Sequence, residues 1–296
     1  MFKIKTILIE SFNYKTRSTT YRRLRTLAVY RHLCFLALVF PFLLTPVSAE
    51  LVDNQKPVIS ILIDDMGDDY QAGIKAILLT GSLSYSFLPN SPHSISLAYI
   101  ASDAGKDVML HLPMESVDEN ALGPNDLRLD MTETAFVKRV RQDLLAVPMI
   151  VGVNNHKGSL LTQHPGHMDW LMGVLKENGN LFFIDSLTSV SSVAGQLATE
   201  AGIANATRNV FLDHHSDMQS IHENYEKLIR IAKKRGAALA IAHPRKNTLK
   251  YLEKRLAQID EDGVRLVPVS EIINHKNRRE TRWRASLSLL PKAAKN

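Results

Sequence analysis

The sequence predicts an α/β fold in which parallel strands alternate with outer helices, as in a closed or nearly closed β/α barrel. Between residues 57 and 273, short runs rich in Ile, Val and Leu are followed about seven times by segments with helical spacing. Seven or eight such units in roughly 220 residues suit a barrel, and an open doubly wound sheet is the structural alternative. No Gly-rich phosphate loop follows any predicted strand, which argues against a nucleotide ligand.

The predicted strands are short apolar runs, and the predicted helices carry apolar residues at intervals of three and four. The first strand, 58–63, stops at the adjacent carboxylates Asp64 and Asp65. The other strands are predicted at 83–88, 107–110, 149–153, 181–184, 210–212 and 237–242, with a further candidate at 264–267. Helices are predicted at 70–79, 92–104, 132–145, 164–177, 191–200, 216–234 and 247–258. Several of them are followed by Gly, the residue at which helices commonly end.

Charge divides the chain into three parts. Residues 1–49 carry eight Lys or Arg against one Glu, and residues 274–296 carry seven against one. The part between therefore has a net charge of −7, although the whole chain is +6. The high isoelectric point comes from the ends, so we expect no nucleic-acid partner for the folded part.

Residues 1–49 show the pattern of a secretory signal peptide with a long basic n-region. Four Arg between positions 22 and 31 precede a 12-residue apolar run, 33–44, and small residues place a cleavage site after Ala49. The run is shorter than the roughly 20 residues of a membrane-spanning helix, although an uncleaved anchor is the alternative. Export is expected in both cases. Cys34, the single cysteine, lies in this run, which leaves the domain predicted at 50–273 without a thiol.

The segment 274–296 is predicted to be a basic, disordered tail. The alternative is a short amphipathic segment in peripheral contact with a membrane surface of anionic lipid, or with an acidic polymer.

His and Asp residues follow most of the predicted strands. In a parallel barrel the carboxyl ends of the strands share one face, and functional residues lie there. A lone Asp is commonly a helix cap, but six strands supplying such residues favour a metal or acid–base site. Without thiols, imidazole and carboxylate ligands suit a catalytic zinc or a related divalent ion. The residues concerned are Asp64, Asp65, His111, Asn155, His156, Asp185, Asp213, His214 and His243.

Six short motifs carry these residues. They are Ile-Asp-Asp-Met-Gly at 63–67, His-Leu-Pro-Met-Glu at 111–115, Gly-Val-Asn-Asn-His-Lys-Gly-Ser at 152–159, Phe-Phe-Ile-Asp-Ser at 182–186, Phe-Leu-Asp at 211–213 and Ile-Ala-His-Pro at 241–244. Together they resemble the divergent polysaccharide deacetylases, distant relatives of the NodB-type carbohydrate esterases. The resemblance spans about residues 57–273 and implies a NodB-like (β/α)7 barrel, a divalent metal such as zinc, and a periplasmic location.

The resemblance also implies roles for single residues. Asp65 matches the metal-binding Asp of the family's paired carboxylates, with His156 as the best His ligand and His111 as the second. Asp64 matches the catalytic base, and His243 the general acid.

Asp185 resembles the charged residue that orients the site, and Asn155 and Asp213 are expected to contact substrate. Arg128, in the loop after the third strand, is a candidate for meeting a substrate phosphate or carboxylate.

The chain departs from the ordinary deacetylases at the histidines. Those enzymes pair two metal ligands as His-x-x-x-His, but here Leu160 stands where the partner of His156 would be, and Ser159 precedes it. The second His must come from another strand, or the metal is bound weakly. Lys157, Leu187 and Arg245 also differ from the residues frequent in the divergent family, which bears on substrate contacts.

The implied activity is hydrolytic removal of N-acetyl groups from an envelope or extracellular polysaccharide. The metal would polarise the acetamide carbonyl and acidify a water, Asp64 would take its proton, and His243 would protonate the departing amine. Two alternatives stay open. One is a non-catalytic envelope protein that binds a glycan or a partner on the same barrel, and the other is a peptidoglycan amidase.

Overall fold

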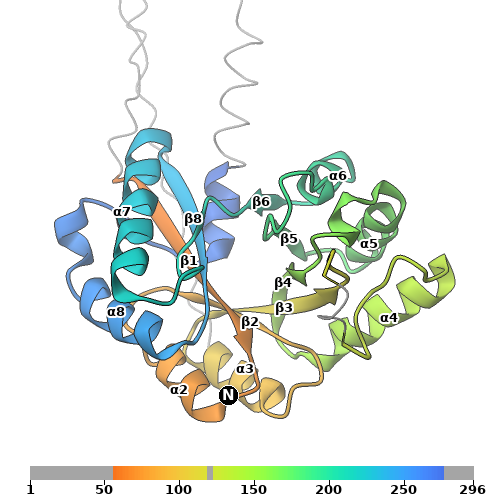
Figure 1. The fold of residues 1–296 in the computed structure, drawn as a ribbon, viewed down its shortest axis with the longest axis horizontal. Helices are drawn as coiled ribbons and strands as arrows, with labels where there is room; N and C mark the ends of the chain where they lie inside the picture. The colour runs from red at the N-terminus through yellow and green to blue at the C-terminus, as the bar shows by residue number, and fades with distance from the viewer. Residues whose placement is uncertain (1–55, 119–122, 277–296) are drawn as a thin grey trace, which may run out of the picture. The chain divides into compact units, whose positions relative to one another are not determined.

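The computed structural model describes residues 56–118 and 123–276. The predicted signal peptide and all but the first three residues of the predicted tail lie outside the described residues. Within them, parallel strands form a strongly curved sheet with helices around its outer side (Figure 1). None of the helices in the described ranges is long and apolar enough to cross a membrane.

The strands follow one another around the sheet in the order β6-β5-β4-β3-β2-β1-β8-β7, with β9 paired to β1, and all pairings are parallel. Their bounds are β1 Val58–Met66, β2 Ser84–Phe87, β3 Asp107–Met114, β4 Ile150–Lys157, β5 Phe182–Asp185, β6 Asn205–Thr207, β7 Val210–Phe211, β8 Ala237–Ala242 and β9 Arg265–Leu266.

The strand order distinguishes the two folds that the sequence allows. In a doubly wound sheet, the chain would cross once to the other side of β1. Strand β7, the first strand after that crossover, would then lie beside β1, and β8 would lie farther out. Here β8 lies beside β1 and β7 lies at the far edge, so the chain keeps one sense of rotation. The predicted barrel is confirmed, in an incomplete form, because β6 and β7 do not pair with each other in the described part. We call this gap the open seam.

The helices begin and end where local chemistry satisfies the backbone. Asp69, Thr132 and Asp217 each accept a hydrogen bond from an amide of the first turn, as N-caps do. The longest helix ends at Gly236, whose φ of 82° lies in the left-handed region. The bounds are α2 Tyr70–Ile77, α3 Ser94–Asp103, α4 Glu133–Ala146, α5 Pro165–Glu177, α6 Ala194–Glu200, α7 Met218–Arg235 and α8 Lys246–Leu256, with 3₁₀ turns at Leu161–Gln163 and Ile259–Asp262.

Several sequence-based bounds need revision. Strand β1 extends to Met66, so Asp64 and Asp65 lie within it rather than just beyond it. Strands β3 and β4 extend to Met114 and Lys157, so His111 and His156 lie within strands rather than just beyond them. Strand β6 was not predicted, because its three residues include two polar ones and show no apolar run. Residues 274–276, assigned to the tail, continue a helical segment that begins at 269.

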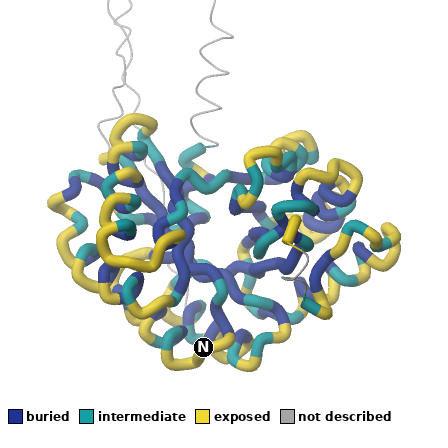
Figure 2. Tube along the Cα trace, in the orientation of Figure 1, coloured by how far each residue is buried: buried dark blue, intermediate teal, exposed yellow. Residues whose placement is uncertain are grey.

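Alternation along the strands separates two apolar layers. Ile59, Ile61 and Ile63 of β1 pack in the larger cluster between the sheet and the helices, whereas Val58 and Leu62 belong to a smaller cluster inside the barrel. The segment 267–273 adds four residues to the interior cluster. The strands are buried while the outer helix faces are exposed (Figure 2). Continuing the inward side of β1 by two residues from Leu62 leads to Asp64, where the interior becomes polar.

Candidate metal centre

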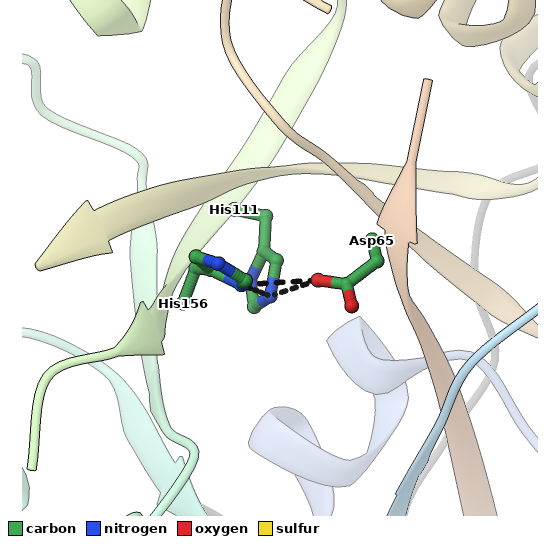
Figure 3. A group of neighbouring side chains, drawn as sticks. All are labelled: Asp65, His111 and His156. Atoms are coloured by element: carbon green, nitrogen blue, oxygen red, sulfur yellow. Dashed lines mark hydrogen bonds and ion pairs between the residues drawn. The ribbon is translucent and has the colours of Figure 1, made fainter. Parts of the chain in front are cut away.

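Three side chains meet at the carboxyl ends of β1, β3 and β4 (Figure 3). The Oδ1 atom of Asp65 lies 3.2 Å from Nε2 of His111 and 3.0 Å from Nδ1 of His156. The two ring nitrogens are themselves 3.1 Å apart. The three predicted metal ligands are thus brought together, each from a different strand.

A local distortion of β1 brings Asp65 into this group. Alternation alone would send Asp64 and Asp65 to opposite faces of the sheet. Asp65 instead has a φ of 55°, and the pairing of β1 with β2 shifts register between Ile63 and Met66. Such irregularities re-aim side chains next to functional sites. Lys157 and Leu187, which end or follow β4 and β5, also have positive φ, so left-handed non-glycine residues gather at this rim.

The spacing of the three donor atoms fits a tetrahedral metal. Ligands about 2.0–2.1 Å from a zinc ion in tetrahedral geometry lie about 3.3 Å from one another, close to the distances seen here. Oδ1 of Asp65 is buried and has no hydrogen-bond partner of good geometry, although two imidazole nitrogens face it. Three donor atoms on one triangular face would leave a fourth position open if a zinc ion bound here, as in catalytic zinc sites.

The protonation states also suit a cation. Burial lowers the pKa of His111 to about 4, so its imidazole is neutral and has a free lone pair. Burial alone would raise the pKa of Asp65, but the imidazoles of His111 and His156 that face its carboxylate hold it far below its usual range. The donor set is therefore one carboxylate and imidazoles, without a thiolate.

Asn154 fixes which nitrogen of His111 faces the cluster. Its Nδ2 donates to both carboxylate oxygens of Asp64, at 3.1 and 3.0 Å. The amide oxygen must then point the other way, where it lies 3.1 Å from Nδ1 of His111 and also accepts from Ser86. His111 consequently carries its proton on Nδ1 and presents the Nε2 lone pair to the cluster.

Asp64 lies beside His111, with 3.6 Å between its Oδ2 and Nε2 of His111, and is buried, with 2% of its surface exposed. Burial first, and then the neighbouring charge of Asp65, raises the pKa of Asp64 well above its usual value, while the Asn154 hydrogen bonds oppose the shift. A carboxylate with a raised pKa accepts a proton more readily, as a general base must.

His243 approaches the cluster from β8. Its Nδ1 lies 2.9 Å from Oδ1 of Asp213, and its Nε2 lies 3.6 Å from Oδ2 of Asp65. Asp213 is fully buried and also accepts from Thr248 and from the His243 amide. Burial would raise the pKa of Asp213, but the bonds from His243 and Thr248 hold it below its usual value. Asp213 therefore orients the imidazole and keeps Nε2 directed into the site.

The other predicted site residues lie apart from the cluster. Asn155 is fully buried on the opposite side of β4 from His156, where it accepts from Ser186 N and donates to the Lys157 carbonyl. Asp185 accepts from the Leu187 and Gly195 amides and from the Ser192 hydroxyl, so it shapes the loop after β5. Arg128 is nearly half exposed and pairs with Asp130 at 3.2 Å.

The sequence-based prediction missed two residues near the site, Asn154 and Arg208. Asn154 could have been found from alternation, because it shares a strand face with His156 whereas Asn155 does not.

Arg208, between β6 and β7, donates from Nε to the Ser186 carbonyl at 2.6 Å and from Nη2 to the Leu187 carbonyl at 2.8 Å. Its guanidinium lies 5.0 Å from the Phe211 ring, which in turn lies 5.3 Å from the His243 ring. No sequence motif signalled Arg208, since its contacts depend on the open seam.

Comparison with known proteins identifies the family. The profile of the divergent polysaccharide deacetylases matches residues 61–273. An uncharacterized protein of Haemophilus influenzae is 33% identical over 204 residues, covering 69% of this chain and 72% of the relative. The chain belongs to the divergent polysaccharide deacetylase family. Another relative, the uncharacterized protein YibQ of Escherichia coli, is 31% identical over 80% of this chain and 75% of its own.

The fold of this divergent polysaccharide deacetylase is also found in a solved structure. An uncharacterized protein of Agrobacterium tumefaciens superposes with a TM-score of 0.71 at 20% identity, covering 74% of this chain and 89% of that one. The predicted NodB-like barrel and the predicted family are both confirmed.

Proposed function

We propose that this divergent polysaccharide deacetylase is a metal-dependent hydrolase that removes N-acetyl groups from an envelope or extracellular polysaccharide. Family membership supports a hydrolase of this kind. The observation that carries the proposal is the triangle of donor atoms from Asp65, His111 and His156, flanked by Asp64 and His243. A metal site with an acid–base pair beside it is what amide hydrolysis needs.

The metal is proposed to be zinc, held by Asp65, His111 and His156. Nitrogen and oxygen ligands with an open position suit zinc, and a bound zinc ion would supply Lewis-acid chemistry to a carbonyl and to water. Asn154 supports this assignment, because it fixes the tautomer of His111 as partners of metal-binding histidines commonly do.

Asp64 is proposed as the general base. It lies 3.6 Å from Nε2 of His111, so it is next to the ligands without being one of the three. Its buried carboxylate, held by Asn154, would take the proton of the attacking water. His243 is proposed as the general acid. Its Nε2 would donate a proton to the departing amine, and Asp213 would stabilise the imidazolium form of His243.

A small cavity supports access of substrate to these groups. It has a volume of about 240 Å³ and lies between the ends of β1 and β8, where Asp65, Asp68, His243 and Arg245 are among its lining residues. Its lining combines apolar surface with the charged side chains of Asp65, Asp68 and Arg245, which can hydrogen-bond the hydroxyl groups of a sugar.

We further propose that the protein acts in the periplasm. The basic region, apolar run and small-residue site of residues 1–49 support export. Cell fractionation and sequencing of the N-terminus of the purified protein test this directly. A mature N-terminus at Glu50 in the periplasmic fraction is expected, whereas an intact N-terminus in the cytoplasmic fraction would contradict export.

Acetate release tests the proposed reaction. The protein, loaded with zinc, is incubated with N-acetylglucosamine oligomers and with peptidoglycan, and the products are identified by mass spectrometry. Loss of acetyl groups from sugar, abolished in Asp64→Asn, is expected. Release of peptide would instead indicate an amidase, and failure both to bind zinc and to release acetate would favour a non-catalytic glycan-binding role.

A further inference from the structure

A second cavity lies at the open seam, beside the amino end of β8 and far along that strand from His243. Its volume is about 580 Å³, within the range of about 300–1,000 Å³ that is usual for small-molecule sites. We call it the seam cavity. Its lining comes from β6, the start of β8, the end of α7 and the helical segment at 269–276.

The wall of the seam cavity is continuous with the apolar interior of the barrel. Ala206, Leu239 and Ile272 line the cavity and belong to the interior cluster, and each has less than a tenth of its surface exposed. Because β6 and β7 do not pair in the described part, the interior is reached here from the side. An apolar chain laid against these residues would extend the core rather than rest on the surface.

The mouth of the seam cavity is basic. Arg235, His275 and Lys276 are among its lining residues, and the described lining includes no Asp or Glu. The ammonium group of Lys276 donates to the backbone carbonyl and side-chain oxygen of Asn205, at 3.1 and 3.2 Å, and both are neutral. A cation held by neutral partners is well placed to bind an anion.

The edge of β8 at this cavity is already occupied. Asn209 donates its amide to the Leu239 carbonyl and accepts from the Leu239 amide through its side-chain oxygen, both at 2.8 Å. An extended peptide adding as a strand would need these same backbone groups. The contacts therefore favour a ligand that does not use backbone hydrogen bonds.

We propose that the seam cavity binds a single-chain anionic amphiphile, taken up as a free molecule, with its alkyl chain against Ala206, Leu239 and Ile272 and its phosphate or carboxylate at Lys276 and Arg235. The site is separate from the proposed deacetylase centre and does not depend on that activity. One pocket of this volume suits one alkyl chain, whereas a membrane surface would call for a broad face.

Calorimetric titration of the whole purified protein with monomeric decyl phosphate tests the proposal. Binding is expected for decyl phosphate, and binding at least about tenfold weaker for inorganic phosphate and for neutral decanol, since both the charge and the chain contribute. Lys276→Gln should weaken decyl phosphate binding about tenfold or more. Lys233→Gln, in the last turn of α7 near Arg235 but outside the cavity lining, should leave decyl phosphate binding within about twofold.

A variant that fills the cavity gives a second criterion. Ala206→Leu should weaken decyl phosphate binding while the far-UV circular dichroism spectrum and the urea unfolding midpoint stay as in the original protein, which shows that the barrel is folded. Equal binding of decanol and no effect of Lys276→Gln would overturn the proposal. So would displacement of decyl phosphate by an acidic peptide, or binding to vesicles of anionic lipid without any binding of the monomer.

Discussion

Replacing Asn154 by Asp should separate metal binding from catalysis. The amide nitrogen of Asn154 donates to both oxygens of Asp64, at 3.1 and 3.0 Å. In Asn154→Asp this contact becomes one between two carboxyl groups at about the same distance, and such a pair cannot ionise fully. One proton is then retained between the two groups at neutral pH, so Asp64 can no longer act as a free base. The substituted side chain can still accept the proton of His111 Nδ1, so the ligand geometry is kept.

The size of the effect follows from the hydrogen bonds lost. A hydrogen bond to a charged group contributes about 1.5–3 kcal/mol, which corresponds to a decrease in kcat/KM of about 10- to 150-fold. The acid limb of the pH profile should move to higher pH, because the shared proton is released only there. Zinc affinity should change by less than about tenfold, as measured by competition with a chromophoric chelator.

Asn155→Asp is the matched control for this experiment. It makes the same change one residue along β4, on the face where Asn155 contacts Ser186 N and the Lys157 carbonyl instead of Asp64. It should reduce stability without moving the acid limb. An unchanged acid limb in Asn154→Asp, with kcat/KM within about threefold of the original, would refute the assignment of Asp64 as a base held by Asn154.

Three further predictions concern other residues. Arg208→Lys should lower kcat more than it raises KM, because one ammonium cannot hold both carbonyls of the loop after β5; partial rescue by added guanidinium salts would distinguish positioning from folding. Asp213→Asn should lower kcat/KM by about 10²-fold or more with zinc content unchanged, because His243 loses its charged partner. Asp143, buried beside Arg139, has a pKa raised to about 6 by burial, so the folded state holds its proton and stability falls as pH rises from about 4 through 6. Asp143→Asn should therefore increase the free energy of unfolding at pH 7.5, on the order of 1–3 kcal/mol, and flatten this pH dependence in urea titrations; lower stability at both pH 4.5 and 7.5 would contradict it.

The fold was predictable from the sequence because its elements are strongly patterned. Local sequence patterns are enough to predict several elements. Strands β1 and β8 are buried, mostly apolar runs, and helices α4 and α7 have N-cap residues and helical periodicity. Strand β6 escaped prediction because three residues of mixed polarity carry no periodic signal. The open seam also could not be foreseen, since strand closure depends on the pairing of short segments and not on any one of them.

The site was predictable in its residue types but not in its geometry. His111 compensates for the absent His-x-x-x-His partner because β3 and β4 are neighbours, with Pro113 opposite His156 in the register. The convergence of Asp64 and Asp65 depends on the positive φ of Asp65, which alternation would not suggest. Arg208 contacts the loop after β5 only because the chain crosses the seam there, so no spacing rule could have found it.

The most direct test of the central claim is the structure of the zinc-soaked protein. Zinc should be found with Oδ1 of Asp65, Nε2 of His111 and Nδ1 of His156 at about 2.0–2.2 Å, and with a position open toward Asp64 and His243. Zinc held by other side chains, or absence of zinc at this rim after soaking, would contradict the assignment of a catalytic metal centre.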